Sequence, residues 1–378
     1  MLDESFESFT EENWTPVKSK KSSKAAKSAA PLQDATNKPA GGKKGSKKTV
    51  EETYQKKTQL EHILLRPDTY IGSIEKTTGP MWVFDEHSQS MVLRNCTYVP
   101  GLYKIFDEIL VNAADNKQRD SSMSYIRVVI DKAQNLISVT NDGEGIPVEM
   151  HAEEKVYVPE LIFGHLLTSS NYNDSEKKTT GGRNGYGAKL ANIFSTAFFV
   201  ETVHSNTKYV QKFSGNMSNI HPPTISKCSS HDYTKISFCP DLKLFNMEEL
   251  DDDISSLFKR RVYDLAGILP KVKVFLNDVR LPVKTFANYV DMFLKNSPLT
   301  GAPSPKVFAR VNERWEVAVA VSEGQFAQIS FVNSIATTKG GTHVNAVVDA
   351  ITSFMVKELN KKTKGVTLKP FHVKNHLM

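Results

Sequence analysis

The residues that follow Val99-Pro100-Gly101 carry the pattern that most constrains this chain. Glu108 and Asn112 are four residues apart, so a helix stacks their side chains on one face. A carboxylate one turn from a carboxamide suits a site for Mg²⁺ and phosphate, because the amide oxygen is a hard ligand and the carboxylate can orient or deprotonate water. A solvated helix face is the alternative interpretation. Apolar residues at helical spacing define the opposite stripe: Leu102, Ile105, Phe106, Ile109, Leu110 and Ala113.

A second segment, Asn141-Asp142-Gly143-Glu144-Gly145, follows two expected strands at 125–130 and 136–139. Two glycines separated by one residue allow the backbone to approach a flat ligand closely. The short polar side chain of Asn141, at the end of a strand, can hydrogen-bond the edge of a base. The triplet Asn-Asp-Gly is also an ordinary turn signal, so this segment is weak evidence alone.

A third segment is a glycine-rich loop in which Gly182, Gly185 and Gly187 lead into an expected helix at 188–194. Such a loop gathers free N–H donors and the positive end of the helix dipole, which suits phosphate. The spacing fits neither the dinucleotide fingerprint nor the P-loop. A flexible surface loop is the alternative for any glycine cluster.

Taken in this order and spacing, the three segments resemble the Bergerat ATP-binding site of the GHKL superfamily. Four longer segments, at 58–72, 105–116, 167–172 and 328–336, are similar to eukaryotic DNA topoisomerase II. The resemblance covers about 53–378. It implies an α+β fold, in which a GHKL two-layer α/β sandwich is followed by a transducer domain of the left-handed βαβ type.

The expected organisation has three parts. Residues 1–52 are a basic arm that we expect to be disordered, because its Lys, Ser, Ala and Gly cannot bury enough apolar surface. Residues 53–284 form the ATP-binding domain with an N-terminal strap, and 285–378 form a transducer domain. The lysine clusters of the arm suggest a solubilising tail, a nuclear-import signal or a DNA contact.

Composition narrows the class of protein further. The net charge is +6, and the 3 cysteines show no CxxC or zinc spacing, which fits a reducing compartment. No long apolar run or secretory leader is present, so we expect no membrane association. With the resemblance, this predicts a nuclear location.

The resemblance also implies roles for individual residues. Glu108 would position and activate the attacking water, Asn112 would coordinate Mg²⁺, and Asn141 would bind the adenine amino group above Thr234. Tyr54, in the strap, would lie near the ATP of the other protomer. Ribose and phosphate contacts fall on Ser169, Ser170 and Asn171 and on Gly182, Arg183, Asn184, Gly185, Tyr186, Gly187, Ala188 and Lys189. DNA contacts fall on Lys361, Lys362 and Lys364.

The implied function is an ATPase gate. Binding of Mg-ATP would join two copies into a homodimer that captures double-stranded DNA, and the full enzyme would pass that duplex through a double-strand break. The family's Gln-Thr-Lys loop would follow the segment matching 373–376, and the sequence stops at Met378 before it. With no DNA-cleavage motif present, we expect a truncated N-terminal piece. A nucleotide-gated DNA clamp with little hydrolysis, and a mismatch-repair or chaperone ATPase, are the alternatives.

Several local expectations depend on periodicity and turn signals alone. We expect a polar helix at 51–65, a loop at 220–232 and a long helix at 247–267. A hairpin is expected around Asn277-Asp278. Residues 343–360 have the pattern of an amphipathic helix, and 328–332 that of a strand.

Overall fold

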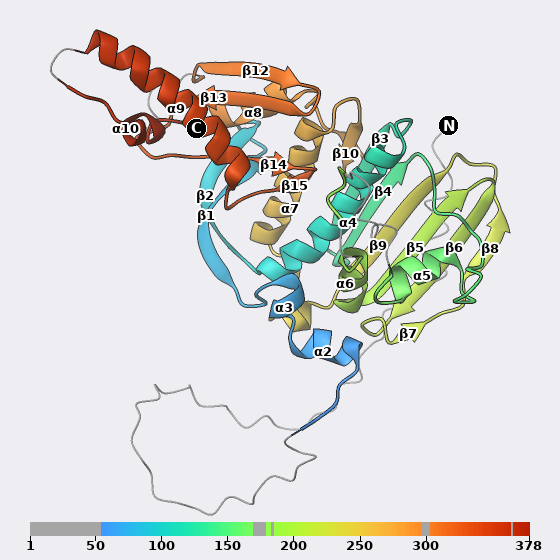
Figure 1. Cartoon of the computed structure of the whole chain (residues 1–378). Helices are drawn as coiled ribbons and strands as arrows, with labels where there is room; N and C mark the ends of the chain where they lie inside the picture. The colour runs from blue at the N-terminus through green and yellow to red at the C-terminus, as the bar shows by residue number, and fades with distance from the viewer. Residues whose placement is uncertain (1–53, 169–178, 183–184, 296–302, 364–365) are drawn as a thin grey trace, which may run out of the picture. The chain divides into compact units, whose positions relative to one another are not determined.

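The computed structural model describes residues 54–168, 179–182, 185–295, 303–363 and 366–378. The chain forms two compact units, Met1–Lys56 and Lys57–Met378, and every element below belongs to the second (Figure 1). Among the described residues, no helix has the length and apolar character needed to cross a membrane.

A mixed sheet of nine strands is the centre of the second unit. Its order is β11-β10-β3-β4-β9-β5-β6-β7, with β8 also paired to β6. Among the described strands of this sheet, β10 and β3 form the one parallel pair. The strands are β3 (Tyr125–Asp131), β4 (Leu136–Asp142), β5 (Ser195–His204), β6 (Thr207–Ser214), β7 (Asn219–Ile220), β8 (Thr224–Lys227), β9 (Tyr233–Pro240), β10 (Lys273–Leu276) and β11 (Val279–Arg280).

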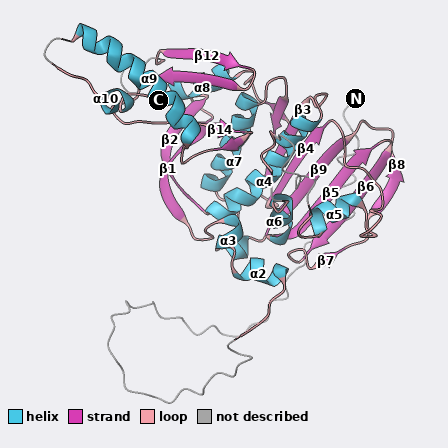
Figure 2. Cartoon of the chain, viewed as in Figure 1, coloured by secondary structure: helices cyan, strands magenta, loops and turns pink. Residues whose placement is uncertain are grey.

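The helices α4 (Pro100–Arg119), α5 (Val158–Gly164), α6 (Gly187–Ile193) and α7 (Asp252–Ile268) lie on one face of this sheet (Figure 2). α4 begins with Pro100, whose fixed φ and missing N–H are tolerated in a first turn. The predicted apolar stripe of α4 is buried, and Leu102, Ile105, Phe106 and Leu110 are 0% exposed. Each such side chain contributes about 1.5–3 kcal/mol through burial, so the core fixes which face of α4 points away from it.

The N-terminal elements of this unit are α2 (Gln59–Leu65), α3 (Asp68–Ile71) and the hairpin of β1 (Thr77–Asp85) with β2 (Ser90–Tyr98), which packs on α7. The helix expected at 51–65 is wrong for the described residues 54–58. Thr58 has extended backbone and forms a capping box with Glu61, so α2 starts only at Gln59.

The C-terminal elements lie beside the β1–β2 hairpin (Figure 1). They are α8 (Phe286–Leu294), β12 (Lys306–Asn312), β13 (Trp315–Ala320), β14 (Phe331–Val332), β15 (Ile335–Ala336), α9 (Thr342–Lys362) and α10 (Pro370–Lys374). The helix predicted at 343–360 is confirmed. Its apolar stripe is only partly covered, because Val348 is buried whereas Phe354 is 67% exposed.

Three other local predictions need correction. β7 and β8 occupy part of the expected loop at 220–232; β8 is an exposed edge strand, so it lacks the alternation that marks a half-buried strand. α7 begins at Asp252 rather than 247, because Asp251 caps it by accepting a bond from the Ile254 amide at 2.9 Å. The strand expected at 328–332 is reduced to β14. The hairpin at Asn277-Asp278 is confirmed, with positive φ at both residues.

Candidate functional site

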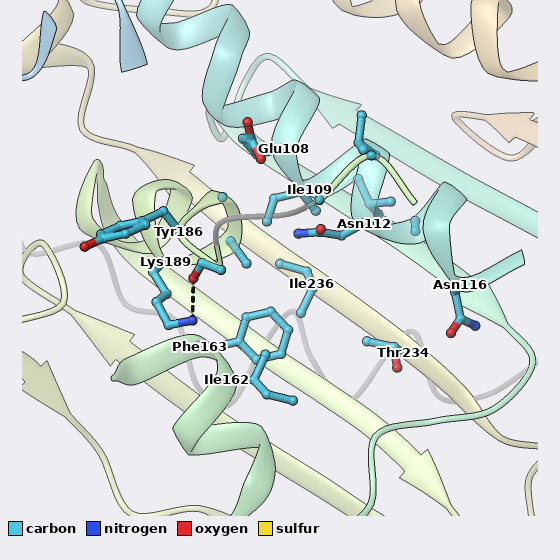
Figure 3. A pocket seen from close by; sticks show the side chains of 18 of the residues that line it. Glu108, Ile109, Asn112, Asn116, Ile162, Phe163, Tyr186, Lys189, Thr234 and Ile236 are labelled. Carbon is cyan, nitrogen blue, oxygen red and sulfur yellow. Dashed lines mark hydrogen bonds between the residues drawn. The ribbon is translucent and has the colours of Figure 1, made fainter. Parts of the chain in front are cut away.

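A cavity of about 840 Å³ lies between α4, the ends of β4 and β9, α5 and the glycine-rich loop. Figure 3 shows Glu108, Ile109 and Asn112 on α4, Ile162 and Phe163 on α5, and Thr234 and Ile236 on β9. The three predicted segments therefore meet in one place. Predicted site residues that line the cavity are Glu108, Asn112, Asn141, Gly182, Gly185, Tyr186, Gly187, Ala188, Lys189 and Thr234.

Glu108 lies against the first residue of α6. A Cβ added at Gly187 would be 2.0 Å from Glu108 Oε2, so only glycine allows the carboxylate to come this close to the loop. Lys104, one turn earlier on α4, forms an ion pair with Glu108. Asn112 lies next to the preceding part of the loop, where its Oδ1 would be 3.4 Å from a Cβ at Gly182. The carboxylate and the carboxamide thus face the same loop.

Asp115 holds the start of the glycine-rich loop, a role that sequence reasoning missed. Its two carboxylate oxygens accept hydrogen bonds from the amides of Gly181 and Gly182, each at 2.8 Å. Burial raises the pKa of Asp115, while the two amides lower it, and burial is the larger effect. The sequence held no signal for this role, because a lone aspartate on a helix has the pattern of a solvated residue.

Asn141 and Thr234 form a cross-strand pair in the floor of the cavity, because β4 and β9 place them opposite each other. Asn141 is 6% exposed, and its Nδ2 donates to the Asp142 carbonyl at 3.0 Å. Thr234 Oγ1 lies 3.1 Å from Oγ1 of the fully buried Thr202, which also accepts the Ile146 amide at 2.9 Å. Thr202 was not predicted, since one strand threonine carries no signal.

The segment after β4 is held closely against the sheet. A Cβ at Gly145 would be 1.9 Å from the Val203 carbonyl oxygen, so the backbone passes where no side chain fits. Asp120 accepts the Glu144 amide at 2.7 Å, and Asn116 donates to the Asp142 carbonyl at 3.3 Å. Asp142 itself accepts the amides of Ser124 and Tyr125, which leaves Asn141 to face the cavity.

Lys189 is 2% exposed and ties the glycine-rich loop to α6. Its ammonium donates to the carbonyl of Gly185 at 2.7 Å, marked by the dashed line in Figure 3, and to that of Thr168 at 2.9 Å. Burial lowers the pKa of Lys189 to about 8. In this structure the side chain holds the loop through these two hydrogen bonds.

The lowered pKa of Lys189 makes the stability of the fold depend on pH. Between pH 8 and 10.5 the unfolded chain holds a proton that the folded chain releases, so stability rises with pH across this window. We expect the unfolding free energy of the unaltered chain to rise by about 3 kcal/mol relative to Lys189→Met over that window. Urea unfolding of both proteins at several pH values measures this. If the unfolding free energies of the two proteins differ by the same amount at every pH, the pKa of Lys189 is not lowered in the folded chain.

Other predicted residues lie elsewhere. Ser169, Ser170, Asn171, Arg183, Asn184 and Lys364 are outside the described residues. Tyr54 belongs to the first unit and is 78% exposed. Lys361 and Lys362 end α9 and do not line the cavity. Gln59 of α2 donates to the Tyr186 hydroxyl at 2.7 Å, which attaches the N-terminal helix of the second unit to the loop.

Comparison with known proteins identifies the family to which the chain belongs. Residues 97–242 match the family described as histidine kinase-, DNA gyrase B- and HSP90-like ATPase, and 285–378 match DNA gyrase B. The solved ATPase region of Saccharomyces cerevisiae topoisomerase II is 53% identical with a TM-score of 0.82, over 87% of this chain and 85% of that one. The chain belongs to the eukaryotic DNA topoisomerase II family. It corresponds to the ATPase and transducer region, and the expected GHKL fold with a transducer is confirmed.

Other topoisomerase II relatives agree. The ATPase and transducer domains from Balamuthia mandrillaris are 51% identical with a TM-score of 0.82, over 87% of this chain and 84% of that one. DNA topoisomerase 2 of Arabidopsis thaliana is 58% identical over 96% of this chain and 24% of its own length. The chain therefore spans about a quarter of the curated relatives it matches. Membership of this family excludes the mismatch-repair and chaperone interpretations.

Proposed function

We propose that this chain is the ATP-operated gate of a DNA topoisomerase II, which binds Mg-ATP, joins a second copy and closes on duplex DNA. The observation that carries the proposal is the approach of Glu108 and Asn112 to Gly187 and Gly182. It brings a carboxylate and a hard oxygen ligand to a loop whose N–H groups suit phosphate. The family supports ATP as the nucleotide.

The residues of the cavity suit Mg²⁺ as well as the nucleotide. Among the described residues no group of three or more His, Cys, Asp or Glu side chains could hold a metal alone. Mg²⁺ suits such a site, because it keeps several waters and takes one or two protein ligands together with substrate phosphates. Asn112 would hold it, and when bound it would neutralise charge on the triphosphate.

The remaining roles follow from the positions of the side chains. Asn141 and Thr234 would bind the base in the floor of the cavity, and the amides at the start of α6 would contact the phosphates. Glu108, held by Lys104, would orient a water and take its proton. In the full enzyme, gate closure would drive one duplex through a break in another, which fits a nuclear location.

ATP hydrolysis by this chain, with and without duplex DNA, tests the proposal. We expect Mg²⁺-dependent turnover that DNA stimulates and that is lost on chelation. ATP binding with no hydrolysis under any condition would instead support a nucleotide-gated clamp. A chain that does not bind ATP would overturn the proposal.

The lysines at the end of α9 predict a measurable DNA contact. Lys361 is 60% exposed at its side chain and is paired to Glu358 at 2.7 Å, and Lys362 follows it. Reversing both charges, Lys361→Glu and Lys362→Glu, should weaken duplex binding about tenfold and lower the salt slope by about 2, since each phosphate contact contributes nearly one unit. Binding is measured by fluorescence anisotropy at several salt concentrations.

The matched control is Lys227→Glu, an exposed lysine on the edge strand β8. It changes the net charge without touching α9, so its salt slope should stay that of the unaltered chain. If the double variant keeps the original slope, these lysines do not contact DNA.

A further inference from the structure

The helix α4 carries two stripes of side chains next to each other. Glu108, Asn112 and Asn116 recur every four residues and line the cavity. Shifted back by one residue, Asp107, Val111 and Asp115 form a second stripe. Because neighbouring residues on a helix are turned about 100° from each other, the second stripe is turned away from the first, although Asp107 and Val111 still border the cavity. Any displacement of the second stripe also moves the first.

Arg261 of α7 contacts Asp107, the first residue of the second stripe. Its side chain is completely buried, and its Nε donates to Asp107 Oδ1 at 2.7 Å. Its Nη2 donates to the Ser334 carbonyl oxygen at 2.5 Å. One guanidinium thus joins α4 to the turn between β14 and β15. A planar fork can make both bonds at once, which a lysine ammonium at that place cannot reproduce.

The β14–β15 turn also touches the glycine-rich loop. Asn333 and Ser334 both have positive φ, and Val332 pairs with Ile335, so this is a tight two-residue hairpin turn. A Cβ at Gly181 would lie 3.0 Å from the Asn333 carbonyl oxygen and 2.8 Å from Val111 Cγ1. One rigid turn therefore presents one carbonyl to Arg261 and the next to the loop.

These contacts close a ring. Asp107 binds Arg261, Arg261 binds the turn at Ser334, the turn packs on Gly181, and the Gly181 amide returns to Asp115 on the same helix. Burying an arginine is costly, and among the described residues its Nη1 has no hydrogen-bond partner, so breaking either of the two bonds that Arg261 does make is strongly unfavourable. The ring fixes α4, the turn and the loop relative to one another.

We propose that Arg261 is a positioning residue for ATP turnover, which clamps Asp107 to the β14–β15 turn and so fixes Glu108 relative to the glycine-rich loop. This inference rests on the proposed function, since it presumes that Glu108 acts on bound ATP. ATP turnover then depends on the position of the β14–β15 turn, which the Arg261 side chain of α7 joins to α4.

The test compares the unaltered chain with Arg261→Lys and with Arg260→Lys. Arg260 is the matched control, because it is the next residue of α7 and is paired to Asp264 at 3.1 Å, away from Asp107 and the turn. We expect Arg261→Lys to lower kcat about tenfold while the Kd for a non-hydrolysable ATP analogue stays within threefold, since misplacing a reacting group costs rate rather than affinity. Arg260→Lys should keep kcat within twofold.

Hydrogen exchange of the 328–337 segment supplies a readout that does not need hydrolysis. Bound analogue should slow exchange there in the unaltered chain and in Arg260→Lys, and not in Arg261→Lys. Equal slowing in all three proteins, or equal loss of kcat in both variants, would overturn the inference and leave the proposed function standing. If the unaltered chain does not bind the analogue, the proposed function fails and the inference fails with it.

Discussion

Replacing Glu108 by glutamine is expected to lower ATP hydrolysis at least 10²-fold and to leave ATP binding within about threefold of the unaltered chain. The carboxamide keeps the shape of the side chain against Gly187, so the cavity stays intact. It cannot take a proton from water, and a positioned general base contributes about 10²–10⁴-fold to a rate. Steady-state hydrolysis and equilibrium binding, measured on the same preparation, give the two quantities.

Glu149→Gln is the control for this substitution. Glu149 is an exposed carboxylate that does not line the cavity, so its loss should change neither quantity. If Glu108→Gln instead abolished ATP binding, Glu108 would be a structural residue of the loop, and its role as a base would be wrong.

The second large effect is expected at Gly187. In Gly187→Ala, the new Cβ would lie 2.0 Å from Glu108 Oε2 and 3.3 Å from Glu108 Cβ. The clash falls on the end of a flexible side chain, so the carboxylate can turn away and the fold can survive. We expect hydrolysis to fall about 10²-fold, as it does when a catalytic group is misplaced, while the free energy of unfolding falls by only about 1–2 kcal/mol.

Gly79→Ala provides the comparison, because a Cβ at Gly79 on β1 meets no atom within 4 Å. Hydrolysis and urea unfolding of the two alanine variants separate catalysis from stability. Normal hydrolysis by Gly187→Ala would show that the working position of Glu108 is not the one against α6.

The parts of the site that sequence predicted are those with a local signal. The apolar stripe of α4 has the period of a helix. Once that stripe is placed against the core, Glu108 and Asn112 must lie on another face of the helix. Asn277-Asp278 predicted the turn between β10 and β11, because both residues tolerate positive φ. The glycine spacing predicted the loop before α6, since glycine is required where Glu108 approaches.

The parts that sequence did not predict depend on distant partners. Asp107, Asp115 and Arg261 have the pattern of ordinary solvated helix residues, and only the fold brings Arg261 to Asp107 and to Ser334. Helix starts were misplaced where a single side chain decides them, as Thr58 and Asp251 do. β8 was missed because an exposed edge strand buries no face and so has no period to detect.

The most direct test of the central claim is the size of this chain in solution with Mg²⁺, with and without a non-hydrolysable ATP analogue. Sedimentation measures it, and a parallel titration measures binding. The proposed gate predicts a monomer without nucleotide and a dimer with it, and Asn112→Ala should weaken both effects together. A chain that binds the analogue and remains a monomer would contradict the gate, and a chain that does not bind would contradict the ATP site itself.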